Sequence, residues 1–244
     1  MLLDREWLVV DVSTFQDPPT IDYDKWATQI DGAVIRIGYT GHTTGLNQVI
    51  DTDFKDHYRE FTSRGIPVGT YFYGVAMTPA VARQEALATI EWLESIDAKL
   101  ELPAFYDTEE TQPGHAPGIG HQYLDKDTLT AVIDTYCETM AEHNIYPGIY
   151  ANMWWFEDRT HMDILDRWDW WVAKWSEPPP RIKWGMWQYT NIGTLDGFNG
   201  PLDLNKMVRD WPSIIRGGEW NDLEPLPPPK KRKGMPIWMM INYN

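Results

Sequence analysis

Apolar and polar positions along the chain form short blocks of two alternating kinds. Short runs of apolar, β-branched and aromatic residues, which predict buried strands, occur in eight places. Stretches with helical character follow the first five runs, whereas only loops separate the last three. We expect strands at 8–13, 32–39, 67–76, 101–110, 146–152, 170–175, 185–190 and 202–205, and helices at 23–30, 53–64, 78–96, 125–143 and 153–167.

Two of the expected helices carry recognisable end signals. Thr78 followed by Pro79 is typical of an N-cap with proline at the first helical position. Gly65 directly after the helix at 53–64 is typical of a glycine C-cap. These signals fix where the helical segments begin and end, and therefore support the alternation of strands and helices.

The order of the elements predicts the class of fold. Strands alternating with helices favour a parallel sheet. Eight strands within about 210 residues favour closure of that sheet into a barrel. The sequence therefore predicts an α/β barrel with five strand–helix units followed by three further strands, formed by residues 1–218 as one domain.

The end of the chain has a different composition. Residues 219–229 are acidic and then Pro-rich, which predicts a stiff spacer, and the basic run 230–233 follows. We interpret 219–233 as a linker, although the basic run resembles a nuclear import signal. The apolar residues 234–244 are too few to fold alone, so we expect them to open a further module or to pack as an added strand.

Acidic residues follow the fourth expected strand. Asp107, Glu109 and Glu110 lie within four positions, after the run Leu-Pro-Ala-Phe-Tyr. Side chains at i and i+2 of a strand share a face about 6–7 Å apart, so Asp107 and Glu109 should point the same way. Such a pair is costly unless it is hydrated, bound to a metal or used, and glycoside hydrolysis uses one. The alternative is a solvated acidic turn.

Two further carboxylates reduce the weight of that alternative. Asp11 and Asp203 fall, like the acidic pair, where we expect strands one and eight to end. Catalytic groups of α/β barrels lie at the carboxyl ends of the strands. A simple acidic turn gives no reason for matching carboxylates on distant strands, so the pattern predicts one acidic site at this edge of the barrel.

Composition excludes several classes of function. A formal net charge of −15 argues against a nucleic-acid surface and against capture of an anionic wall polymer by bulk electrostatics. No apolar run approaches the roughly 20 residues of a membrane helix. The N-terminus lacks the features of a signal peptide, so we expect synthesis in the cytoplasm and a separate route of release. The single cysteine, Cys137, excludes an intramolecular disulfide.

Eight short motifs, in order along the first 210 or so residues, resemble the family 25 glycoside hydrolases, the muramidases common among phage endolysins and bacterial autolysins. No one motif is specific, but the ordered set is. The motifs are Val10-Asp11-Val12-Ser13 with Gln16, Ala33-Val34-Ile35-Arg36, Tyr71-Phe72-Tyr73, Asp107-Thr108-Glu109, Gly148-Ile149-Tyr150, Trp171-Val172-Ala173-Lys174-Trp175, Trp187-Gln188-Tyr189 and Leu202-Asp203-Leu204-Asn205.

The resemblance implies an irregular TIM-like barrel and hydrolysis of the β-1,4 bond from N-acetylmuramic acid to N-acetylglucosamine in peptidoglycan. By similarity Glu109 is the general acid, and the charge of Asp107 favours its protonated form. Asp107 supports the oxocarbenium-like transition state or orients the substrate N-acetyl group, which can itself be the nucleophile. Asp11 and Asp203 resemble the other site acids of the family. The nucleophile and the stereochemical course stay unassigned.

Five residues are candidates for binding the glycan, because aromatic faces stack on sugar rings and polar groups hold acetamido and hydroxyl groups. Packing of the barrel is the alternative role for each of them. It is favoured more strongly for Trp154, Trp155, Trp168 and Trp170, which are not nominated as binding residues. The candidates are Arg36, Tyr73, Tyr150, Trp175 and Gln188.

No cofactor is expected. The loop 111–122 carries His115 and His121 and is predicted to border the cleft. Two histidines do not make a metal site, because a stable site needs three or four ligands. Glu110 either raises the pKa of Glu109 further or faces solvent.

Other functions remain compatible with the pattern. Another barrel glycosidase, for example one cutting chitin, would need a different acidic signature on the fourth strand. A catalytically silent saccharide-binding protein or phage tail component would not need an acid pair. The sequence does not distinguish lysis at the end of infection from local wall cutting at entry, nor does it give the oligomeric state.

Overall fold

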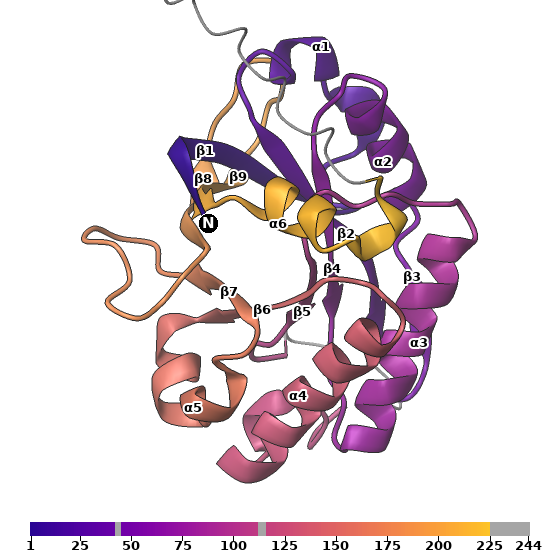
Figure 1. The fold of residues 1–244 in the computed structure, drawn as a ribbon, viewed down its shortest axis with the longest axis vertical. Helices are drawn as coiled ribbons and strands as arrows, with labels where there is room; N and C mark the ends of the chain where they lie inside the picture. Colours follow the sequence, from indigo (N-terminus) through magenta and orange to yellow (C-terminus); the bar gives the residue numbers. More distant parts are fainter. Residues whose placement is uncertain (42–44, 112–115, 225–244) are drawn as a thin grey trace, which may run out of the picture.

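A computed structural model describes residues 1–41, 45–111 and 116–224 of the chain (Figure 1). Nine strands form one sheet, in the order β1-β9-β8-β7-β6-β5-β4-β2-β3. The strands are β1 (Leu2–Val12), β2 (Gly32–Thr40), β3 (Gln48–Ile50), β4 (Val68–Tyr73), β5 (Ala104–Asp107), β6 (Pro147–Asn152), β7 (Asp169–Ala173), β8 (Met186–Gly193) and β9 (Leu202–Arg209).

Five helices lie between strands and a sixth follows β9 among the described residues. Thr78 caps α3, because its side chain accepts a hydrogen bond from the amide of Val81 and Pro79 opens the helix. Asp125 caps α4 in the same way through the amide of Thr128. The helices are α1 (Tyr23–Trp26), α2 (Phe54–Thr62), α3 (Pro79–Glu94), α4 (Lys126–Glu142), α5 (Met162–Leu165) and α6 (Trp211–Gly217), with short turns η1 (Pro18–Thr20), η2 (His121–Tyr123), η3 (Trp155–Arg159) and η4 (Trp220–Asp222).

The sheet closes into a barrel because β1 pairs with both β2 and β9. The predicted architecture is confirmed: eight strands form the barrel, and β3 is an extra strand paired to the outer side of β2. The alternation of strands and helices favours a parallel sheet, but β9 is antiparallel to both β8 and β1, so the prediction that Asp203 lies at the carboxyl end of its strand is wrong. Asp203 therefore lies near the beginning of its strand, yet it reaches the barrel edge where Asp11 ends β1.

Alternate side chains of each strand point into the barrel, and these inward-facing side chains form layers. One layer is apolar and buried. Two residues further toward the edge that carries Asp11, the same strands place polar side chains on the same inward face. The pairs are Val9 and Asp11 on β1, Phe105 and Asp107 on β5, Met186 and Gln188 on β8, and Met207 and Asn205 on β9.

Close packing fills the apolar layer. The Phe105 ring lies against Trp171 and Trp211, with ring centroids 5.2 and 5.5 Å away. A β-carbon on Gly148 would lie 2.5 Å from atoms of the Phe105 ring, so glycine is required there. Trp211 opens α6 and donates to Asp169, the first residue of β7, over 2.8 Å. Helix α6, which the sequence did not predict, therefore closes the end of the barrel opposite the polar layer.

The helices cover the outside of the barrel (Figure 1). Helices α3 and α4 lie side by side, joined by the hydrogen bond from Tyr136 to Thr89 at 3.1 Å. Cys137 is buried within this layer. In the described part of the chain, no helix is long and apolar enough to cross a membrane.

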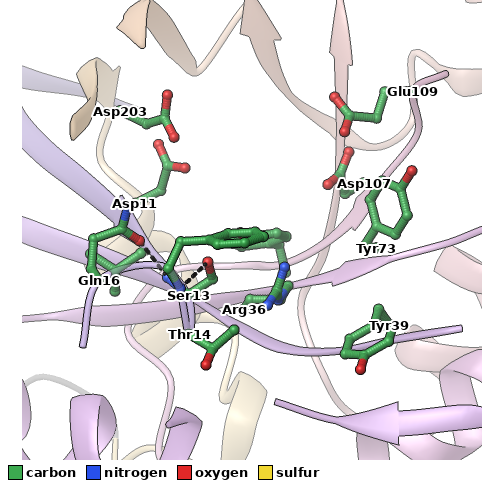
Figure 2. A pocket seen from close by; sticks show the side chains of 13 residues that line it. Asp11, Ser13, Thr14, Gln16, Arg36, Tyr39, Tyr73, Asp107, Glu109 and Asp203 are labelled. Atoms are coloured by element: carbon green, nitrogen blue, oxygen red, sulfur yellow. Dashed lines mark hydrogen bonds between the residues drawn. The ribbon is translucent and has the colours of Figure 1, made fainter. Parts of the chain in front are cut away.

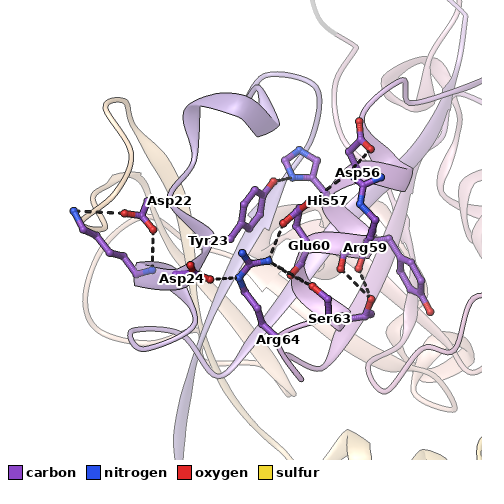
Figure 3. A network of polar contacts seen from close by, with 12 residues as sticks. Asp22, Tyr23, Asp24, Asp56, His57, Arg59, Glu60, Ser63 and Arg64 are labelled. Atoms are coloured by element: carbon purple, nitrogen blue, oxygen red, sulfur yellow. Dashed lines mark hydrogen bonds and ion pairs between the residues drawn. The ribbon is translucent and has the colours of Figure 1, made fainter.

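A polar network joins α1 to α2 (Figure 3). Arg64 bridges Asp24 and Glu60, each over 2.7 Å. The Tyr23 hydroxyl lies 2.7 Å from Nδ1 of the buried His57, whose Nε2 lies 3.3 Å from the carbonyl of Ser13. Through the contact of His57 with Ser13, the network therefore supports the loop that follows β1.

The segment after α6 continues to pack against the barrel. Asn221 is buried, donates to the carbonyl of Leu100 over 2.7 Å and accepts from the amide of Tyr146 over 2.7 Å. The first residues of the predicted linker 219–233 are thus docked, and the domain boundary at 218 stays a prediction. The rest of that linker and the apolar tail 234–244 lie outside the described residues.

Candidate active site

A cleft with two lobes lies over the polar layer of the barrel. The larger lobe has a volume of about 670 Å³ and the smaller about 320 Å³. Both lobes are lined by the same four acids, which Figure 2 shows pointing into a common space. These acids are Asp11, Asp107, Glu109 and Asp203. The structure therefore brings together all four predicted acids, at the junction of the two lobes.

Asp11 is held by two amide side chains. Its Oδ2 accepts hydrogen bonds from Nδ2 of Asn205 at 2.8 Å and from Nε2 of Gln188 at 3.1 Å. Trp171 fixes the orientation of Asn205, because its indole N–H donates to Oδ1 of Asn205 over 2.7 Å. One oxygen of Asp11 is therefore fixed by groups that favour its charged form.

Gln188 extends this network into the smaller lobe. Its Oε1 accepts from the hydroxyl of Tyr150 and from the indole N–H of Trp175, both at 2.9 Å. Tyr150 and Gln188 are buried, whereas 58% of Trp175 is exposed. The indole of Trp175 is thus held at one edge while most of its surface remains available to a ligand.

No residue that the structure describes donates such a hydrogen bond to the acids at the end of β5. The strand ends at Asp107, but pairing continues by one residue, since the Thr108 amide donates to the Tyr150 carbonyl over 2.9 Å. This keeps Asp107 and Glu109 directed into the same cleft (Figure 2). Asp107 is buried, and its Oδ1 has no hydrogen-bond partner among the described residues.

Burial and mutual repulsion raise the pKa values of the four acids. Desolvation raises the pKa of Glu109 to about 7, with further contributions from the charges of Asp203 and Glu110. Desolvation raises the pKa of Asp203 to about 6. The pKa values of Asp107 and Asp11 are also well above the usual range, because both groups are buried and face other acids. The cleft therefore holds one acid, Glu109, that keeps its proton up to a pH of about 7.

The larger lobe contains the other two predicted binding residues. Arg36 lies in β2, and its Nε donates to Oδ2 of Asp51 over 2.7 Å. Tyr73 ends β4, and its hydroxyl lies 3.5 Å from the carbonyl of Glu110. All five binding candidates therefore line the cleft, although their contact with a ligand remains a prediction.

The predicted border loop behaves differently at its two histidines. His121 is fully buried beside Tyr106, with Nε2 3.3 Å from the Tyr106 hydroxyl. The prediction that His121 borders the cleft is therefore wrong. His115 lies outside the described residues. Within the ranges that the structure describes, no group of three or more His, Cys, Asp or Glu side chains is arranged to hold a metal ion.

Sequence reasoning missed several residues of the cleft. Asn205 and Tyr71 belong to motifs quoted above, and the two-residue alternation from buried apolar neighbours identifies both as inward-facing. Phe15 and Tyr39 line the larger lobe beside Arg36. The exposed Phe15 had a local signal, an aromatic ring in a polar loop directly before Gln16.

The arrangement suits acid chemistry on an extended ligand. Glu109 can donate a proton near neutral pH, and Asp107 beside it can stabilise positive charge when ionised. Aromatic and amide side chains line both sides of this pair. A polymer lying through both lobes would therefore present an internal bond to the acids.

The chain is similar to known proteins in sequence and in fold. In E. coli (strain K12), the uncharacterized protein YegX is 23% identical over 201 residues, covering 80% of this chain and 67% of YegX. The modular autolysin LytC from Streptococcus pneumoniae, solved with a synthetic peptidoglycan ligand, has a TM-score of 0.71 at 24% identity over 82% of this chain. The bacterial lysozyme from Streptomyces coelicolor has a TM-score of 0.63 at 21% identity, over 82% of this chain and 91% of that one.

The structural likenesses establish the fold, and this chain spans about half the length of LytC, 46%. The sequence model of glycosyl hydrolases family 25 matches residues 10–198, which include Asp11, Asp107 and Glu109. That match covers well over half of the chain. The chain therefore belongs to glycosyl hydrolases family 25.

Proposed function

We propose that the protein is a muramidase, which hydrolyses the β-1,4 bond between N-acetylmuramic acid and N-acetylglucosamine in peptidoglycan. The observation that carries the proposal is the acid pair at the end of β5, which lies at the junction of the two lobes and accepts no hydrogen bond from a described residue, with the pKa of Glu109 raised to about 7. A general acid needs a proton at the working pH, and this environment supplies it. The complex of LytC with a synthetic peptidoglycan ligand supports the choice of substrate.

In this proposal each acid has a distinct role. Glu109 protonates the oxygen of the leaving sugar, and the carboxylate of Asp107 supports the positive charge that develops on the other sugar or orients its N-acetyl group. Asp11 and Asp203 complete the acidic site from β1 and β9. Arg36, Tyr73, Tyr150, Trp175 and Gln188 bind the glycan on the two sides of the scissile bond.

The proposal includes a setting for this activity. In it the protein acts on the bacterial wall, either in phage lysis or as part of a virion. Its partner is the glycan strand. A free enzyme in lysates would support lysis, and copurification with particles would support entry.

The test identifies the new chain ends on purified peptidoglycan by borohydride reduction and mass spectrometry. Reducing muramic acid ends from the native protein, and none from Glu109→Gln, are the expected result. Reducing glucosamine ends would show a glycosidase that cuts the other bond. Binding of glycan without new ends would instead identify a silent saccharide-binding protein.

A further inference from the structure

The guanidinium of Arg36 is held in a fixed position in the cleft. Its carbon lies 5.2 Å from the ring centroid of Phe15 and 5.4 Å from that of Tyr39, so two aromatic rings pack against it. Its Nε is bonded to Asp51, and only 13% of the side chain is exposed. Packing and one hydrogen bond therefore fix the position of the planar group.

Asp51 fixes Arg36 without satisfying it completely. The Asp51 side chain is fully buried, and it also accepts from the amide of Thr14 at 3.1 Å and from that of Asp53 at 3.0 Å. Its charge is thus shared between two backbone amides and one guanidinium nitrogen. Within the described residues, neither Nη1 nor Nη2 of Arg36 has a hydrogen-bond acceptor. Two donors of a fixed, largely buried guanidinium are therefore left for a ligand.

The position of Arg36 makes these donors part of the larger lobe (Figure 2). Among the described residues that line either lobe, Arg36 is the single basic side chain. The chain as a whole carries a formal charge of −15. The net negative charge of the protein therefore does not attract an anionic group of the substrate. Among the described lining residues, Arg36 offers the one positive charge to which such a group can bind.

We propose that the two Nη groups of Arg36 bind a carboxylate attached to the muramic acid residue of the substrate. This inference rests on the proposed muramidase function. Muramic acid differs from glucosamine by a lactyl ether that ends in a carboxyl group. That group is either free or linked to a peptide that carries its own carboxylates. Two parallel N–H donors match the two oxygens of a carboxylate, whereas an acetamido oxygen uses only one.

The neighbouring acids permit this binding. Burial raises the pKa of Asp11, with a further contribution from the charge of Asp203, and burial raises the pKa of Asp107, with a further contribution from the charge of Glu109. The charge facing a bound carboxylate is therefore smaller than a count of the acids suggests. The larger lobe becomes the side of the cleft that recognises muramic acid, and the smaller lobe carries no basic residue among those described.

The test measures kcat and KM on four matched glycan preparations. The first carries peptide stems with free carboxylates, and the second has those carboxylates amidated. In the third, an amidase has removed the stems and left the lactyl carboxylate, which is methylamidated in the fourth. The native protein should prefer the charged member of one pair by about tenfold in kcat/KM, mainly through KM. The first pair would identify the stem as the source of the carboxylate, and the second pair the lactyl group.

Variants connect the preference to Arg36. Arg36→Gln should cleave charged and amidated glycans equally, with KM for the charged form raised to that of the amidated form. Arg36→Lys keeps the charge but loses the planar pair of donors, so most of the preference should disappear; it carries the test if Arg36→Gln fails to fold. The matched control is Arg83→Gln on the outer side of α3, where Arg83 pairs with Glu142, and it should retain the native preference.

Equal kcat/KM for charged and amidated glycans in the native protein would overturn the inference while leaving the muramidase intact. A preference that persists in Arg36→Gln would overturn it as well. If the native protein cleaves none of the four preparations, the proposed function fails instead. Calorimetric binding of the same glycans then decides the inference, which requires tighter binding of a charged form that Arg36→Gln abolishes.

Discussion

The two walls of the cleft place the same chemical group in opposite settings. On the wall formed by β1, β8 and β9, Asp11 accepts hydrogen bonds from Asn205 and Gln188. On the wall formed by β5, Oδ1 of Asp107 has no partner among the described residues, and no described donor contacts the carboxyl of Glu109. Both walls carry acids whose pKa values are raised by desolvation, so the difference lies in the donors.

That difference assigns the roles. Hydrogen bonds that favour the charged form oppose the effect of burial on the pKa of Asp11. The pKa of Glu109 has no such opposition, and burial together with the charges of Asp203 and Glu110 raises it to about 7. The donors to Asp11 fix the position of its carboxyl group, whereas no described donor opposes the raised pKa of Glu109. The fold achieves both with one alternation of inward-facing residues.

The largest expected effect comes from removing the proton of the donor-free wall. Glu109→Gln should lower kcat by at least about 100-fold, because general acid catalysis contributes roughly 100- to 10,000-fold. Its thermal unfolding should match that of the native protein, since the carboxyl makes no hydrogen bond to a described residue. Turnover and calorimetry measure the two quantities. Native-like turnover would remove Glu109 from the role of acid and end the proposed division between the walls.

Replacing one aspartate on each wall tests the difference in hydrogen-bond donors through its effect on the free energy of unfolding. Asp11→Ala leaves Gln188 Nε2 without its acceptor and weakens the bonding of Asn205, so we expect a loss of about 1–3 kcal/mol in the free energy of unfolding. Asp107→Ala removes a buried carboxyl with an unsatisfied oxygen and should cost less, or stabilise the fold. Urea unfolding at pH 7 gives both values. Equal losses would show that the donors do not distinguish the walls.

The sequence predicted most of this fold because its signals are local. The cap at Thr78 and the alternation of strands and helices each depend on a few neighbouring residues. The prediction failed where pairing depends on distant segments. Residues 2–7 are partly exposed and show no apolar run, yet they extend β1 because β9 lies beside them. The direction of β9 likewise depends on its two partners and not on its own residues.

The site divides in the same way. The acids were predictable because Asp107 and Glu109 are close in sequence and Asp11 and Asp203 end or begin apolar runs. Their environments were not predictable, since the donors to Asp11 come from residues 177 and 194 positions away. The same holds for Arg36, whose partner Asp51 lies across a loop. Sequence patterns therefore identified the reactive groups, and only the fold shows which of them are held by donors.

A smaller effect is expected at the outer edge of the donor-rich wall. Trp175→Ala removes an exposed ring that donates to Gln188, and we expect KM to rise by about tenfold with little change in kcat. Trp175→Phe keeps an aromatic face and should retain most of the affinity. Steady-state kinetics and thermal unfolding of both variants separate binding from folding. A loss of stability with unchanged KM would assign Trp175 to barrel packing, the alternative considered for it.

The smallest effect is expected from removing a charge outside the cleft that raises the pKa of Glu109. Glu110 is exposed, and its negative charge contributes to the raised pKa of Glu109. Glu109 must be protonated to act as the acid, so kcat/KM should fall as the pH rises through about 7. Removing the neighbouring charge in Glu110→Gln favours ionisation of Glu109, so this fall should move to lower pH.

The control for that shift is Glu91→Gln, an exposed charge on α3 whose removal should leave the profile unchanged. The shift in Glu110→Gln should shrink at high salt, because exposed charges are screened. An alkaline limb that stays in place in both variants would mean that burial alone sets the pKa of Glu109. The donor-free wall would then keep its proton independently of the acids around it, and the contrast between the walls would depend only on the hydrogen bonds of Asp11.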